Sequence, residues 1–235
     1  MKSIIFSLLL LLPFTLKAQD FYIFEYHENL VTFHDIRNAP KIPISMEASR
    51  IDAINRYING IKGVSNLYVH NNRSLYKFDR QINPEEFKNL KSSGVVYALS
   101  YYKDFIDDVL IGYGGRLRDG TIIKENASAF NQWKHTSRDS IIRGFECKMA
   151  INENDGSVAW YTPEIPLPEG PLFHGKLPGL IILLIRGNDK IEMVGIKKEI
   201  FDLSIFDLPK TKRTIKYSDF ETIRPNLSIS EERKN

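Results

Sequence analysis

The hydrophobic pattern of the chain centres on residues 173–185, which contain an uncharged apolar run at 180–185. This run shows no alternation of apolar and polar positions, so a strand formed from it is expected to be covered on both faces. Pro178 and Gly179 stand directly before it and predict a tight turn. Because the run is too short to span a membrane, we expect it to be the core strand of the fold.

Shorter segments on both sides of this run have the alternating or β-branched and aromatic composition of strands. Turn-forming residues at 70–73, 154–156 and 187–188 predict hairpins between some of them. Residues 112–120, rich in glycine and charge, are expected to form a loop, and the four prolines of 163–171 predict an irregular connection. The expected strands are residues 21–26, 64–69, 75–78, 95–102, 121–124, 130–135, 141–151, 158–162 and 190–201.

Two segments have helical patterns. Apolar residues recur every three or four positions between Ile44 and Ile61, and Ser45 and Gly60 suit the two ends of an amphipathic helix. A second, shorter helix is expected to begin at Asn83 and Pro84. The fold class predicted is mainly β: a single antiparallel, curved sheet or half-barrel with one or two packed helices, the sheet wrapping round the first helix.

The N-terminus has the composition of a secretory signal peptide. A basic start is followed by an apolar stretch at residues 4–16 and by Ala18, after which cleavage is expected. A retained membrane anchor is the alternative, which the interruption at Pro13 and the short length disfavour. The expected organisation is a signal peptide at 1–18, a β-rich domain at 19–208 and a polar, loosely held tail at 209–235.

The net charge and the single cysteine limit which partners and which stabilising bonds are expected. Cleavage removes Lys2 and Lys17 from 32 basic residues that face 29 acidic ones, which leaves a net charge of about +1 and gives no electrostatic case for nucleic acid. Cys147 is the one cysteine, so the exported fold cannot rest on an internal disulfide. On a strand, Cys147 shares a face with Phe145, Met149 and Ile151, which predicts a buried, inert thiol; a reactive thiol or an intermolecular bridge is the alternative.

No catalytic or metal-binding constellation stands out. The five histidines lack the spacing of a zinc site, and the acidic cluster at 104–108 lacks the calcium-loop pattern and is expected to be a solvated turn. No nucleophile elbow or phosphate-binding loop occurs, and no cofactor is expected. The residues expected to line a groove for an apolar or glycan ligand are Trp160, Tyr161, Pro163 and Phe173; the alternative is a proline-packed core edge.

Several motifs occur in order along the chain: Trp133, GFECKMA at 144–150, AWYTPEIP at 159–166, Gly170-Pro171 and LPGLI at 177–181, with Ser74 in a weaker early hairpin. Together they resemble the GLPGLI family of exported bacterial proteins. Lys176 stands where the first glycine of the motif is expected, and the turn at 154–157 lacks an expected arginine. The family residues, which look structural, are Gly144, Cys147, Trp160, Gly170, Pro171, Leu177, Pro178, Gly179, Leu180 and Ile181.

The resemblance implies no enzymatic activity or cofactor. It implies an exported β-rich domain, often in a genetic setting of outer-membrane uptake receptors. We therefore expect a non-enzymatic, envelope-associated protein in the periplasm, at the outer membrane or secreted, which binds an outer-membrane receptor, another protein partner or an apolar ligand and is not transmembrane after signal removal. The alternative is a hydrolase of envelope or glycan substrates that uses dispersed carboxylates.

Overall fold

The computed structural model describes residues 21–29, 62–79, 99–115, 117, 120–187 and 189–220. In this part the chain forms one open sheet of 12 strands, in the order β12-β6-β5-β4-β3-β2-β1-β11-β10-β9-β8-β7. The strands are β1 (Phe21–Asn29), β2 (Lys62–His70), β3 (Arg73–Asp79), β4 (Ser100–Asp104), β5 (Val109–Tyr113), β6 (Thr121–Asn126), β7 (Trp133–Ile142), β8 (Phe145–Asn152), β9 (Val158–Thr162), β10 (Leu180–Arg186), β11 (Asp189–Lys198) and β12 (Arg213–Ile215), with the 3-10 turns η3 (Ala127–Phe130) and η4 (Leu203–Phe206).

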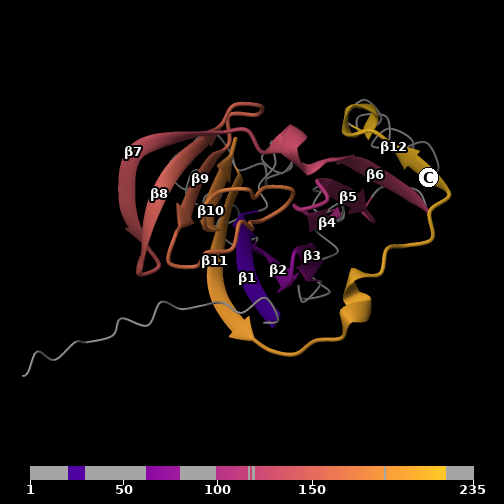
Figure 1. The fold of residues 1–235 in the computed structure, drawn as a ribbon, viewed down its shortest axis with the longest axis horizontal. Helices are drawn as coiled ribbons and strands as arrows, with labels where there is room; N and C mark the ends of the chain where they lie inside the picture. Colours follow the sequence, from indigo (N-terminus) through magenta and orange to yellow (C-terminus); the bar gives the residue numbers. More distant parts are fainter. Residues whose placement is uncertain are drawn as a thin grey trace, which may run out of the picture.

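The first strand lies in the middle of the sheet. β1 pairs with β2 on one side and with β11 on the other, so it joins the early strands β2–β6 to the late strands β7–β11. Neighbouring strands are antiparallel except β12 and β6, which are parallel. The sheet curves from β7 through β1 to β6 and β12, and the connection between β9 and β10 lies inside the curve (Figure 1). The prediction of a mainly β, curved sheet is confirmed.

The core strand expected from the apolar run is confirmed as β10. Leu180 to Leu184 are buried on both faces of the sheet, and Ile185 is partly exposed at the end of the strand. Tyr26 from β1 donates a hydrogen bond to the carbonyl oxygen of Ile181 (2.7 Å). The expected strand at 21–26, the hairpin through 70–73 and the returning strand after 187–188 also appear, as β1, β2–β3 and β11.

The prediction of one strand over 141–151 is wrong. Two strands, β7 and β8, meet there in a hairpin whose turn residues Arg143 and Gly144 both have positive φ, 54° and 85°. A two-residue turn of this kind matches the twist of the paired strands. Phe145, Cys147 and Met149 share a face as expected. Ile151 is exposed, because from Ala150 onward the buried side chains of β8 lie on the other face of the strand.

Three other boundaries differ from the sequence prediction. Gly112 lies in β5, not in a loop, and pairs there with Tyr101 of β4 and Ile123 of β6. Residue 130 belongs to η3, and the strand begins at Trp133. At the other end of the sheet, residues 213–215 of the expected tail form β12, and Ile215 and Phe220 are buried.

The packed helices of the prediction are not borne out. Both expected helices, within 44–61 and 83–94, lie outside the described residues. The described ranges contain a short helical segment at 217–220 and the two 3-10 turns. No helix among them is long and apolar enough to cross a membrane.

Candidate functional site

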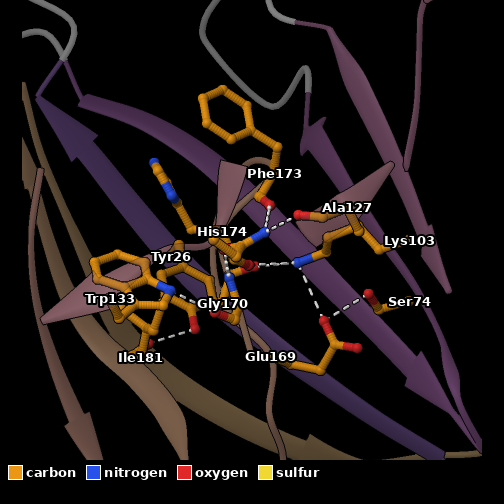
Figure 2. A network of polar contacts seen from close by, with 12 residues as sticks. Tyr26, Ser74, Lys103, Ala127, Trp133, Glu169, Gly170, Phe173, His174 and Ile181 are labelled. Atoms are coloured by element: carbon orange, nitrogen blue, oxygen red, sulfur yellow. Dashed lines mark hydrogen bonds and ion pairs between the residues drawn. The ribbon is translucent and has the colours of Figure 1, made fainter. Parts of the chain in front are cut away.

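The connection between β9 and β10, residues 163–179, is the crossing segment: it runs over the inner face of the curved sheet (Figure 1). A segment without regular structure needs partners for its buried backbone groups. Lys103 of β4 supplies several of them, because its Nζ donates to the carbonyl oxygens of Gly170 (2.6 Å) and His174 (3.0 Å). Lys103 Nζ also lies 3.1 Å from Oε2 of Glu169, which accepts from Ser74 Oγ of β3 (2.7 Å). Figure 2 shows these contacts converging on the segment.

Two side chains next to η3 and β7 hold the residues on either side of His174. Asn131 donates to the carbonyl oxygen of Phe173 (3.1 Å) and accepts from the backbone N–H of Gly175 (2.8 Å). The indole N–H of Trp133 donates to the carbonyl oxygen of Gly175 (2.8 Å) (Figure 2). The crossing segment is therefore fixed to strands that are far apart in sequence.

The charges in this network are shut off from solvent. Lys103 is 0% exposed and Glu169 is buried beside it. Burial lowers the pKa of Lys103 and raises the pKa of Glu169, while the attraction between the two groups opposes both shifts. Because the ammonium has three acceptors and the carboxylate has two donors, we assign the pair as ionised and structural.

A second buried carboxylate lies on the same face. Glu28 accepts hydrogen bonds from Ser65 Oγ (2.5 Å) and from the hydroxyl of Tyr76. Burial raises the pKa of Glu28, and it also raises that of Tyr76 well above its ordinary value. Tyr76 packs edge-on against Tyr26, which connects this group to the hydrogen bond on β10.

His174 is buried in an unusual way. Its ring is 0% exposed, lies beside Trp133 and Phe173, and has no hydrogen-bond partner among the described residues for either ring nitrogen. The Oδ2 atom of Asp155 lies 3.8 Å from Nε2. Burial lowers the pKa of His174 to about 3, against an opposing effect of Asp155.

His174 should make the fold sensitive to acid. The unfolded chain protonates this side chain below about pH 6.5 and the folded chain only below about 3, so the unfolded state binds more protons in this window and stability falls as the pH drops. Between pH 7 and pH 5 we expect a loss of about 2 kcal/mol from this residue. Urea midpoints of the wild type and His174→Gln at both pH values measure it; an equal loss in both proteins would contradict the assignment.

Lys176 occupies a backbone conformation that favours glycine. Its φ is 59°, in the left-handed region, which explains why a glycine is expected there in related sequences. In this chain the lysine side chain forms a partly exposed ion pair with Asp108 (2.7 Å). Hydrogen bonds from Lys176 and Ser128 hold the pKa of Asp108 below its ordinary value. The acidic cluster thus includes a carboxylate that anchors the crossing segment.

Comparing Lys176→Gly with Lys176→Ala isolates the backbone term, because both variants lose the ion pair. The glycine variant is expected to be more stable by about 1 kcal/mol, the cost that a Cβ adds in the left-handed region. Chemical denaturation of the two variants provides the measurement. If the alanine variant were as stable as the glycine variant, the backbone of Lys176 would not have the positive φ described above.

The structure places the four groove residues expected from the sequence in different surroundings. Trp160 is partly buried opposite Met149 and Leu183, and Tyr161 is buried with its hydroxyl 3.0 Å from Nδ1 of His135. Phe173 is buried in an aromatic cluster with Tyr101, Phe130 and Tyr217. Pro163 lines a hollow, which is described next.

An open hollow of about 500 Å³ lies where β7, β8 and the end of β9 meet. It is lined by residues 139–141, 146–148 and 163–164, and we call it the rim groove. All of these residues are exposed except Cys147, whose thiol has a pKa raised to about 11 by burial. Ile141 is 76% exposed, and three carboxylates, those of Asp139, Glu146 and Glu164, stand around it. A raised thiol pKa makes Cys147 a poor nucleophile.

The structure places the residues of the family motifs in turns, in the core and in the crossing segment. Gly144 forms a hairpin turn, Cys147, Leu177, Leu180 and Ile181 are buried, and the carbonyl oxygen of Gly170 accepts from Lys103. Pro171 is buried, with its carbonyl oxygen accepting from the backbone N–H of His174 (3.2 Å), whereas Pro178 is exposed in the turn before β10.

The described residues contain no group of three or more His, Cys, Asp or Glu side chains placed to hold a metal ion.

Sequence reasoning missed Lys103, Glu169 and Asn131, the side chains that anchor the crossing segment. One signal was present for Lys103, which follows Tyr101 by two positions and so shares its inward face on β4. It also missed the carboxylates of the rim groove, which come from three separate segments and have no fixed spacing in sequence.

Comparison with known proteins agrees with this picture of the fold. No curated protein sequence matches the chain significantly. The solved structures of PNGF-II, in its C2 and P21 crystal forms, match with TM-scores of 0.54 and 0.53 at 15% identity over 88% of this chain. The chain spans about a third of the length of PNGF-II. At this identity the match shows a shared fold.

A family model described as a protein of unknown function (Porph_ging) matches residues 120–183. This stretch holds most of the motifs on which the sequence resemblance rests, together with the crossing segment and every residue of the rim groove. Over about a quarter of its length the chain is therefore similar to an uncharacterised protein family, with which the GLPGLI resemblance is compatible.

Proposed function

We propose that this protein is an exported, non-enzymatic binding protein of the bacterial envelope that holds a partner protein in the rim groove. The observation that supports this proposal is that one set of charged side chains is buried and another is exposed. The charges of Lys103 and Glu169 are buried and fix the crossing segment to β4, whereas the charges of the rim groove are exposed, as is its isoleucine, Ile141. We take this hollow, in which an exposed apolar residue and charged groups lie together, as the interaction site.

Export and the class of partner rest on the sequence. Residues 1–18 have the features of a signal peptide and lie outside the described residues. The GLPGLI resemblance favours an outer-membrane uptake receptor as the partner. Intact mass of the protein recovered from its native envelope checks the first point, because a chain that retains Met1 would contradict cleavage after Ala18.

The second candidate is a hydrolase, because the rim groove gathers three carboxylates. Carboxylate catalysis needs one group kept protonated by an environment that excludes water, so that it can act as a general acid. Asp139, Glu146 and Glu164 are all exposed, which favours binding over hydrolysis.

Site-specific photo-crosslinking tests the binding function. A photoreactive amino acid replaces Ile141 in the rim groove or, as a matched control, Ile106, which is 69% exposed in the turn between β4 and β5. After irradiation in the native envelope, we expect a discrete crosslinked protein from position 141 that position 106 does not give. Equal patterns at both positions, or none at 141, would contradict a partner in the rim groove.

A further inference from the structure

The charged and apolar groups that line the rim groove indicate which class of partner it binds. This inference rests on the proposed function. The groove is lined by three carboxylates and one lysine, Lys148, so its lining carries an excess of negative charge. Glu164 Oε1 accepts a hydrogen bond from the backbone N–H of Glu146 (2.7 Å), which fixes this carboxylate at the wall of the groove. Its negative charge also reaches Cys147, where it adds to the rise in the thiol pKa.

The negative charge is not neutralised within the described part of the protein. Asp139 and Lys148 are direct partners in the ladder of β7 and β8, yet no ion pair within 4.0 Å joins them. The nearest salt bridge on this hairpin, Arg143 with Glu192 (2.7 Å), lies outside the groove lining. A ligand with positive charge would therefore gain Coulomb attraction, and an acidic ligand would meet repulsion.

The apolar part of the lining consists of aliphatic atoms. Ile141 and Pro163 supply exposed apolar surface, and the buried Cys147 also belongs to the lining. No aromatic ring of the described residues lines the groove: Tyr161 is the ladder partner of Lys148 but is buried, with its hydroxyl beside His135, and Trp160 pairs with Met149. Sugar rings bind well against aromatic faces, so this lining suits aliphatic side chains better than a glycan.

The groove also adjoins an open strand edge. β7 is the last strand of the sheet, and its ladder with β8 is regular from Asp139 to Ile142, after a bulge between His135 and Asp139. No described strand pairs with the other side of β7. An extended segment can add to such an edge through backbone hydrogen bonds, with its alternate side chains reaching the adjacent hollow.

From this geometry we infer that the rim groove binds an extended, basic and aliphatic segment of a partner protein by strand addition to β7. Its basic side chains pair with Asp139, Glu146 and Glu164, and its aliphatic side chains pack on Ile141 and Pro163. The bulge and the charged residues earlier in β7 confine the addition to residues 139–142, which limits unspecific edge pairing.

Fluorescence anisotropy with two labelled peptides tests this inference on the purified protein. One peptide alternates arginine and valine, and the other alternates glutamate and valine. We expect saturable binding of the arginine peptide, weaker at high salt, and none of the glutamate peptide. Glu146→Gln with Glu164→Gln should weaken binding by about tenfold, while the new amide at position 164 keeps an acceptor oxygen for the backbone N–H of residue 146.

The matched control is Glu153→Gln with Asp207→Asn, which removes the same charge from exposed positions outside the groove and should leave binding unchanged. Equal binding of both peptides, equal loss in the control, or preferential binding of a neutral oligosaccharide would overturn the inference. A crosslink at position 141 without peptide binding would overturn only the basic, aliphatic class of partner, whereas loss of the crosslink would remove the proposed function itself.

Discussion

Lys103→Met is expected to lower the free energy of unfolding by about 3–5 kcal/mol, the cost of removing one partner from a buried ion pair. The methionine fills a similar volume but leaves the carboxylate of Glu169 without its ammonium partner. The carbonyl oxygens of Gly170 and His174 also lose their donor. Since domains are stable by only about 5–15 kcal/mol, a large part of the stability should disappear, as a shift of the urea midpoint shows.

A second substitution separates charge from packing. Glu169→Gln in the Lys103→Met background removes the stranded charge, and the amide still has Ser74 as a hydrogen-bond partner. The double variant is therefore expected to recover part of the lost stability. If Lys103→Met alone changed stability by less than about 1 kcal/mol, the pair could not be the anchor of the crossing segment.

Gly179→Ala is expected to destabilise the fold by about 3 kcal/mol or more, the combined cost of backbone strain and overpacking. Gly179 has φ 154°, and a Cβ at this position would lie 2.1 Å from the carbonyl oxygen of Thr162. The obstructing atoms belong to the backbone of β9 and the start of the crossing segment, so no side-chain rotation can make room. The turn before β10 would have to move.

Gly195→Ala is the matched control, because this glycine lies in β11 and a Cβ there would meet Glu25 Cβ at 3.7 Å, an ordinary contact. Its substitution is expected to change stability by less than about 1 kcal/mol. Thermal or urea unfolding of both variants gives the comparison. Similar stabilities for the two would mean that the turn at 178–179 is not packed against β9.

The strands that could be predicted are those whose local pattern matches their environment. The run at β10 lacks polar positions because both faces of the strand are covered, and the hairpin of β2 and β3 has its turn residues between two alternating segments. β5 was not predicted because Gly112 and its neighbours have the composition of a loop, whereas in the structure Gly112 pairs with Tyr101 and Ile123 in the ladder. The turn between β7 and β8 was not predicted, because its first residue is Arg143 and a non-glycine residue rarely takes a positive φ.

The site was harder to predict because its residues are far apart in the sequence and only the fold brings them together. Lys103 and Glu169 are 66 positions apart, and only the placement of the crossing segment over β4 brings them together. A single lysine among aromatic residues on a short strand gives no sign of its partner. The rim groove likewise depends on the hairpin at 143–144, which places Ile141 opposite Glu146 in the ladder. With 141–151 as one strand, these residues could not have been paired.

We propose that the buried network is a scaffold and that the rim groove is the functional surface. Crosslinking from position 141 in two variant backgrounds separates these roles: Ser74→Ala, which removes one hydrogen bond from the network, and Glu146→Gln with Glu164→Gln, which alters the groove. Each protein is first shown to be folded. We predict that the network variant keeps the crosslinked partner and the groove variant loses it. A folded Ser74→Ala protein that loses the partner while the groove variant keeps it would contradict the claim.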